Sequence, residues 1–210
     1  MRKSNAEAAE TRKRILAAAS DMFLRNGISA TAISDIMVAA GLTQGGFYRH
    51  FESKEHLVAA ANAWAFEKLL ALMDGAVAGK PPREALDLIV YYYLHQSEYP
   101  EYGALCPLIN LSSELRNADG QIKEVINEGY ARFVKMFASY LMRLDYSDYL
   151  GVAESMLSIL VGAVTLSQLI TQADLSKAIL TNAQNTITLI LQNSATSSGL
   201  VTKPTQPLAA

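Results

Sequence analysis

The chain has 210 residues, half of them hydrophobic, with a formal net charge of −2 and a single cysteine. This is enough apolar material for one or two packed domains, and it excludes an internal disulfide framework and a strongly basic surface. The charge is uneven, because residues 1–60 carry eight Lys and Arg against six Asp and Glu, whereas the remainder carries ten against fourteen.

Helical periodicity dominates the N-terminal part. A first helix presents an apolar face and stops at Asn26-Gly27. Thr31 is expected to cap a second short helix that ends at Gly41, and Thr43 a third, from Gln44 to His50. Ser53 is expected to cap a fourth helix that runs to about Met73.

Five further helices are expected, over residues 82–97, 104–116, 121–144, 148–172 and 175–192. Seven of the nineteen residues from Ser155 to Ala173 are Ser, Thr or Gln, so we interpret this uncharged stretch as a buried helix and expect no membrane span. With no signal-peptide pattern at the start, we expect a cytoplasmic protein. The expected division is an N-terminal helical domain over 6–52, a larger helical domain over 53–192 and a disordered tail over 193–210.

Three short helices within residues 6–51, the last two joined by a turn at Ala40-Gly41-Leu42, fit a helix-turn-helix unit whose second helix enters the DNA major groove. Phe47 and Phe51 are four residues apart and are expected to face the domain core. The outward face would then carry Gln44, Gly45, Tyr48 and Arg49.

Two features of this region point to a partner. The adjacent glycines Gly45 and Gly46 each cost about 1 kcal/mol in a helix, which close approach to another molecule would explain. A flexible loop is the alternative. The cation of Lys54 opposes the dipole at the start of its helix, and a bound phosphate would satisfy both the amine and the helix N-terminus. The alternative is a solvated lysine, which is the more common case for any single lysine.

The runs from Thr31 to Ile36, from Ala39 to Thr43 and from Phe47 to Leu57 resemble the DNA-binding domain of the TetR family of bacterial regulators. The resemblance covers about residues 10–60. It implies an all-α fold: an N-terminal three-helix helix-turn-helix DNA-binding domain followed by a C-terminal helical ligand-binding and dimerisation domain. The glycine pair departs from the pattern, since it leaves fewer side chains to read bases.

The resemblance also implies roles for individual residues. Phosphate contacts are expected from Thr31, Tyr48, His50 and Lys54, and base-edge contacts from Thr43, Gln44 and Arg49. The chemistry agrees, because Gln pairs with adenine and Arg with guanine, whereas Tyr, His and Lys reach backbone oxygens. For His50, local packing at the helix end is an equal alternative.

The resemblance further implies dimerisation through the last two long helices. The uncharged helix must be covered on nearly every side, and a second chain would supply the missing cover, unless it is a core helix within one chain. The expected interface stripes are Met156, Leu160, Ala163, Val164 and Ser167 on one helix and Ile179, Ala183, Ile187 and Ile190 on the next.

A run from Gly103 to Leu115 resembles one TetR subgroup in which a cysteine precedes a glutamate by eight residues and in some members senses oxidants or electrophiles. We favour an inertly packed Cys106. Aromatic residues gather nearby and predict an apolar pocket with polar tips, with plain core as the alternative. The expected pocket residues are Trp64, Tyr92, His95, Tyr102, Cys106 and Asn110.

These patterns predict a homodimeric repressor that leaves its operator DNA when it binds an unknown small-molecule effector. No cofactor or metal is expected. We find no metal-ligand spacing, nucleophile elbow or cofactor fingerprint, which argues against an enzyme. A protein-interaction module and an activator stay open as alternatives.

Overall fold

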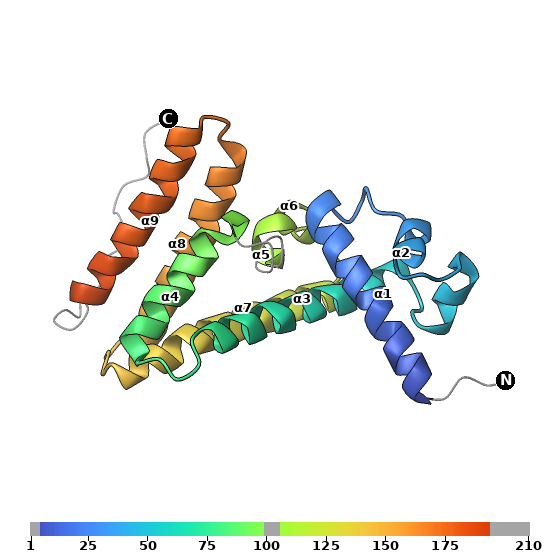
Figure 1. Cartoon of the computed structure of the whole chain (residues 1–210), viewed down its shortest axis with the longest axis horizontal. Coiled ribbons are helices and arrows are strands. Elements are labelled where there is room, and N and C mark those ends of the chain that lie inside the picture. Colours follow the sequence, from blue (N-terminus) through green and yellow to red (C-terminus); the bar gives the residue numbers. More distant parts are fainter. Residues whose placement is uncertain (1–4, 99–105, 194–210) are drawn as a thin grey trace.

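The computed structural model describes residues 5–98 and 106–193, and all regular structure within these ranges is helical (Figure 1). The all-α prediction is confirmed. The elements are α1 (Asn5–Asn26), α2 (Ile33–Ala39), the 3₁₀ helix η1 (Gln44–Arg49), α3 (Lys54–Ala76), α4 (Pro82–Leu94), the 3₁₀ turn η2 (Gln96–Glu98), α5 (Pro107–Asn110), α6 (Ser112–Leu115), α7 (Gly120–Arg143), α8 (Tyr149–Leu169) and α9 (Ala173–Asn193).

Two apolar cores share the long helix α3. The N-terminal core joins α1, α2 and η1 to the first half of α3, and it also takes in Leu111, Leu115 and Ile122. The second core begins at Phe66 of α3 and continues through α4, α7, α8 and α9. In Figure 1, α3 and α7 run side by side from one end of the molecule towards the other, so they connect the two cores.

The helix predicted over 104–116 is in fact two short helices, α5 and α6, separated at Leu111. Pro107 begins α5, where its missing N–H costs nothing. The predicted helix 148–172 ends at Leu169, and the helix predicted from 175 begins at Ala173. Of the predicted tail, Asn193 is the last residue of α9, and residues 194–210 lie outside the described ranges.

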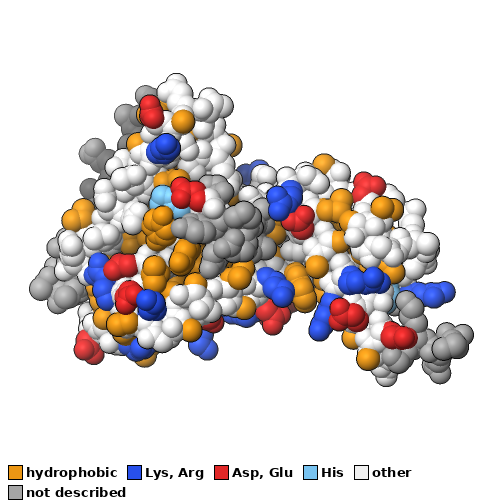
Figure 2. Space-filling view, in the orientation of Figure 1, with side chains coloured by type: hydrophobic (Ala, Val, Ile, Leu, Met, Phe, Trp, Pro, Cys, Tyr) orange, Lys and Arg blue, Asp and Glu red, His pale blue; other side chains and the backbone are white. Residues whose placement is uncertain are grey.

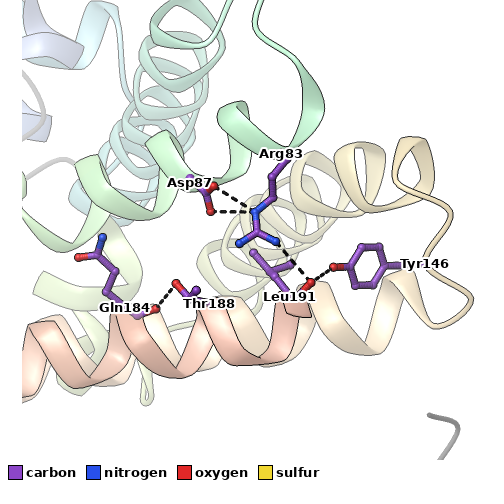
Figure 3. A network of polar contacts seen from close by, with 6 residues as sticks. All are labelled: Arg83, Asp87, Tyr146, Gln184, Thr188 and Leu191. Atoms are coloured by element: carbon purple, nitrogen blue, oxygen red, sulfur yellow. Dashed lines mark hydrogen bonds and ion pairs between the residues drawn. The ribbon is translucent and has the colours of Figure 1, made fainter. Parts of the chain in front are cut away.

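The end of α9 is tied to two other elements (Figure 3). The carbonyl of Leu191 accepts hydrogen bonds from Tyr146, in the turn between α7 and α8, and from Arg83 of α4. Arg83 also pairs with Asp87 one turn along α4, at 3.0 Å. These bonds satisfy a carbonyl that lacks a partner within its own helix.

Among the described residues, α8 is the one helix long and apolar enough to cross a membrane by length and composition, and 39% of its most apolar window is buried. Its buried side chains, among them Val152, Leu157 and Leu160, belong to the second core with α4, α7 and α9. One side of α8 therefore packs in the second core.

Candidate nucleic-acid interface

The turn before η1 has the geometry expected of a helix-turn-helix. Gly41 adopts a positive φ of 68°, and the Leu42 amide donates to the Met37 carbonyl at 2.8 Å. Thr43 is the N-cap residue, as predicted, but its side chain makes no capping hydrogen bond. The segment that follows is a 3₁₀ helix, in keeping with its two weakly helix-forming glycines.

Two aromatic anchors fix η1 to the N-terminal core. Phe47 and Phe51 are 0% and 1% exposed and stack with ring centroids 5.8 Å apart, which confirms the prediction from their spacing. Arg12 of α1 lies over the Phe51 ring at 4.2 Å, and its guanidinium donates to the His50 carbonyl at 2.8 Å. Arg12 is not among the predicted site residues, because its partners are a ring and a carbonyl 38 or more residues away in sequence.

The opposite side of η1 faces solvent. Thr43, Gln44, Gly45 and Arg49 are exposed, and Tyr48 is 74% exposed although its ring rests edge-on against Phe47. A Cβ added at Gly45 would meet no atom within 4 Å. η1 therefore presents an amide, a phenol and a guanidinium outward.

Thr31 does not fit the predicted roles. The second helix begins at Ile33 with Ala32 as its N-cap, and the Thr31 side chain is buried. Its hydroxyl donates to the Gly27 carbonyl at 2.7 Å and so turns inward, away from any phosphate. A threonine hydroxyl can donate to the carbonyl four residues earlier instead of capping the helix that follows.

Lys54 begins α3, as expected. Ser53 caps this helix by accepting a hydrogen bond from the His56 amide at 3.1 Å, which confirms the predicted cap. The Lys54 amine donates to the Ile28 carbonyl at 2.7 Å, and its side chain is half-buried. This carbonyl already supplies one partner for the amine.

Both signs of charge occur around α1, α2 and η1. Figure 2 shows Lys and Arg side chains at this end of the molecule with Asp and Glu interspersed among them. Part of the mixture consists of local pairs such as Arg25 with Asp21, 2.7 Å apart. The charge pattern alone therefore does not single out a surface for DNA, and the assignment depends on the geometry of η1.

The predicted pocket residues are spread over α3, α4 and α5. Trp64, Tyr92, His95 and Asn110 are half-buried, and Cys106 is 1% exposed. Tyr102 lies outside the described residues. The structure brings Asn110 to Cys106, whose carbonyl accepts from the Asn110 amide at 3.4 Å.

Two cavities of several hundred Å³ lie elsewhere in the structure. One of about 400 Å³ lies between α7 and α8 and is lined mainly by apolar groups, including Tyr130, Val134 and Met142. Another, of about 340 Å³, lies between Ile28, Lys54 and Glu114. Neither includes a residue predicted for the pocket.

Most residues of the predicted dimer stripes pack inside the chain's own core. Met156, Leu160, Ala163, Val164, Ala183 and Ile187 are buried in the chain's own core. Ile179 and Ile190 are partly buried against the same core, and the Ser167 hydroxyl bonds to the Val164 carbonyl. The physical reason is that α8 is apolar on most sides, and its most regular stripe packs against α4, α7 and α9.

The surfaces of α8 and α9 that remain exposed carry large apolar side chains. Leu166, Leu169, Leu175 and Leu189 are between 52% and 70% exposed. On α8 they follow small residues such as Ser158 and Gly162, which are also exposed. We name these two faces, together, the outer face of the α8–α9 hairpin.

Comparison with known proteins agrees with this geometry. Residues 15–61 match the family model described as "Bacterial regulatory proteins, tetR family". The chain is 48% identical over 54 residues to the HTH-type transcriptional repressor BepR of Brucella suis, a match that covers 26% of each chain. It is 45% identical over 98 residues to the HTH-type transcriptional regulator AcrR of Shigella flexneri, covering 46% of this chain and 45% of that one.

These matches span only about a quarter to a half of the length of the curated relatives. A solved structure extends the similarity to most of the chain. The TetR transcriptional regulator from Chloroflexus aurantiacus superposes with a TM-score of 0.76 and 27% identity, covering 90% of this chain and 98% of that one. All three are regulators and none is named as an enzyme.

Proposed function

Because the chain belongs to the tetR family of bacterial regulatory proteins, we propose that it is a homodimeric, cytoplasmic repressor that an effector releases from operator DNA. The observation that carries the proposal is the geometry of η1, which exposes Gln44, Tyr48 and Arg49 while Phe47 and Phe51 hold it on the core. A helix held in this way meets the major groove without having to order its backbone first.

Within this proposal, base edges are read by Thr43, Gln44 and Arg49. Tyr48, His50 and Lys54 contact phosphates, and Gly45 lets the backbone approach the DNA closely. The exposed phenol of Tyr48 supports a phosphate role, because its ring is already held against Phe47. Lys54 would bind a phosphate at the start of α3 while it keeps the Ile28 carbonyl as its second partner.

Dimerisation is proposed for the outer face of the α8–α9 hairpin. Exposed leucines on both helices leave apolar surface in water, and a second copy would cover it as a four-helix bundle about a two-fold axis. This replaces the predicted stripes, which are already used inside the chain.

The effector is proposed to be a small molecule that binds beside α4 and α5, close to Tyr92, His95 and Asn110. Each of these side chains is half-buried, and Tyr92 packs against the second core. Repression is chosen over activation because BepR, similar over the DNA-binding segment, is named a repressor.

The test is a titration of fluorescent duplex DNA carrying the region upstream of the protein's own gene, at several salt concentrations. We expect tighter binding to this duplex than to a scrambled one, with an affinity that falls steeply as salt rises. Equal and salt-insensitive binding to both duplexes would overturn the proposal in favour of a protein-interaction module.

A further inference from the structure

The loop between α1 and α2 forms an anion-binding concavity, and a carboxylate from a distant part of the chain fills it. Gly27 has a φ of 87°, and the next two backbone amides, of Ile28 and Ser29, point to the same side. Successive N–H groups after a left-handed residue make such a nest. The Glu114 carboxylate accepts from both, at 2.7 Å and 2.9 Å.

A backbone carbonyl of the same loop, that of Ile28, also has a hydrogen-bond partner. Lys54 of α3 donates to the Ile28 carbonyl at 2.7 Å. Partial burial alone would raise the pKa of Glu114, but hydrogen bonds from Ser29 and Ile28 and the nearby Lys54 charge outweigh it, so the pKa lies below its usual value. Glu114 is therefore ionised at neutral pH and makes charge-assisted hydrogen bonds.

Glu114 comes from α6, 85 residues further along the chain than Ser29. Its neighbours Leu111 and Leu115 are buried in the N-terminal core. The segment α5–α6 thus inserts two apolar side chains and one carboxylate into the helix-turn-helix unit, although it lies between α4 and α7 in sequence. A Cβ at Gly27 would lie 3.0 Å from a Glu114 oxygen, so the fit is close.

We propose that Glu114 is a positioning residue that fixes the orientation of the helix-turn-helix unit relative to α3 and α7. Any displacement of α5–α6 then pulls directly on the loop that leads into α2 and η1. This inference deepens the proposed function and rests on it where DNA is concerned. The contact of the Glu114 carboxylate with the Ile28 and Ser29 amides, which we call the Glu114 joint, is testable without DNA.

The experiment measures an intrachain distance by pulsed spin-label spectroscopy. Labels are attached at Ala39→Cys on α2 and Glu128→Cys on α7, both exposed positions, in a Cys106→Ser background. Doubly labelled protein is diluted with unlabelled protein so that only distances within one chain are read. The variants are Glu114→Gln, which keeps one uncharged acceptor, and Glu114→Ala, which keeps none. Glu124→Gln, an exposed carboxylate of α7, is the charge-matched control.

We expect a narrow distance distribution in the wild type and in Glu124→Gln. It should broaden or shift in Glu114→Gln and more so in Glu114→Ala. In parallel, deuterium uptake by the peptide that contains Ile28 and Ser29 should become on the order of tenfold faster in Glu114→Gln, since each amide loses a charge-assisted bond.

Gly27→Ala disturbs the joint from the other side and should broaden the distribution even if the Glu114→Ala variant fails to fold. Unchanged distributions in Glu114→Gln and Gly27→Ala, or equal broadening in Glu124→Gln, would overturn the proposal. Because no DNA is present, such a result is distinct from a failure of the protein to bind an operator.

Discussion

The Tyr93 hydroxyl lies 3.0 Å from the Cys106 sulfur, and both side chains are 1% exposed. Burial raises the pKa of the Cys106 thiol above its ordinary value, even though hydrogen bonds from Tyr93 and from the Leu108 and Ile109 amides lower it. The reactive thiolate is therefore scarce at neutral pH.

From this pairing we predict that Cys106 is inert in the folded protein. Iodoacetamide at pH 8 should modify it far more slowly than in urea-unfolded chain, as followed by intact mass. A mild oxidant should weaken DNA binding equally in the wild type and in Cys106→Ser. Rapid native-state alkylation, or an oxidant effect that disappears in the variant, would instead identify a sensor.

Gly45 should be replaceable without cost to the free protein but not to the complex. Because a Cβ there meets open space, Gly45→Ala should keep or raise the melting temperature. Against DNA the same methyl group should cost about 1–3 kcal/mol of binding, the range for overpacking a tight contact. Gly75→Ala in α3, where a Cβ also meets open space, is the control: it too should keep or raise the melting temperature, but it should leave the DNA affinity unchanged. Wild-type affinity in Gly45→Ala would show that the backbone does not approach DNA closely.

The outer face of the α8–α9 hairpin should determine the oligomeric state. Leu166→Asp and Leu189→Asp should each convert the proposed dimer to monomer at micromolar concentration in sedimentation velocity. Burying one leucine side chain contributes roughly 1.5–3 kcal/mol to the association free energy. In a two-fold symmetric dimer each substitution removes this contribution from both chains. Val38→Asp, at a 74% exposed site on α2, should stay dimeric. Dimers in both leucine variants would place the interface elsewhere.

Trp64 should report the effector. It is half-buried in α3, so a small movement of α3 against its neighbours changes the exposure of the indole ring to water. A compound that releases DNA in a screen should shift the emission of the wild type and leave Trp64→Phe without the response. A silent Trp64 would mean that α3 does not move when DNA is released.

Local rules predicted much of this structure. The cap at Ser53 and the inward pair Phe47 and Phe51 follow from spacing alone, because their partners lie within four residues. The Glu114 joint could not be predicted, since its partners are backbone amides that leave no side-chain pattern. Nor could the inward face of α8 be chosen, because a helix that is apolar almost all round offers several equivalent stripes.

The assignment of roles on η1 is tested most directly by comparing Gln44→Ala with Tyr48→Phe on two duplexes, one selected from random-sequence DNA by the wild type and one scrambled. Gln44→Ala should lose about 1–3 kcal/mol on the selected duplex and little on the scrambled one, because a base contact carries specificity. Tyr48→Phe should weaken binding to both duplexes by similar factors, because a phosphate contact carries no sequence specificity. Equal losses on both duplexes in Gln44→Ala would contradict the account.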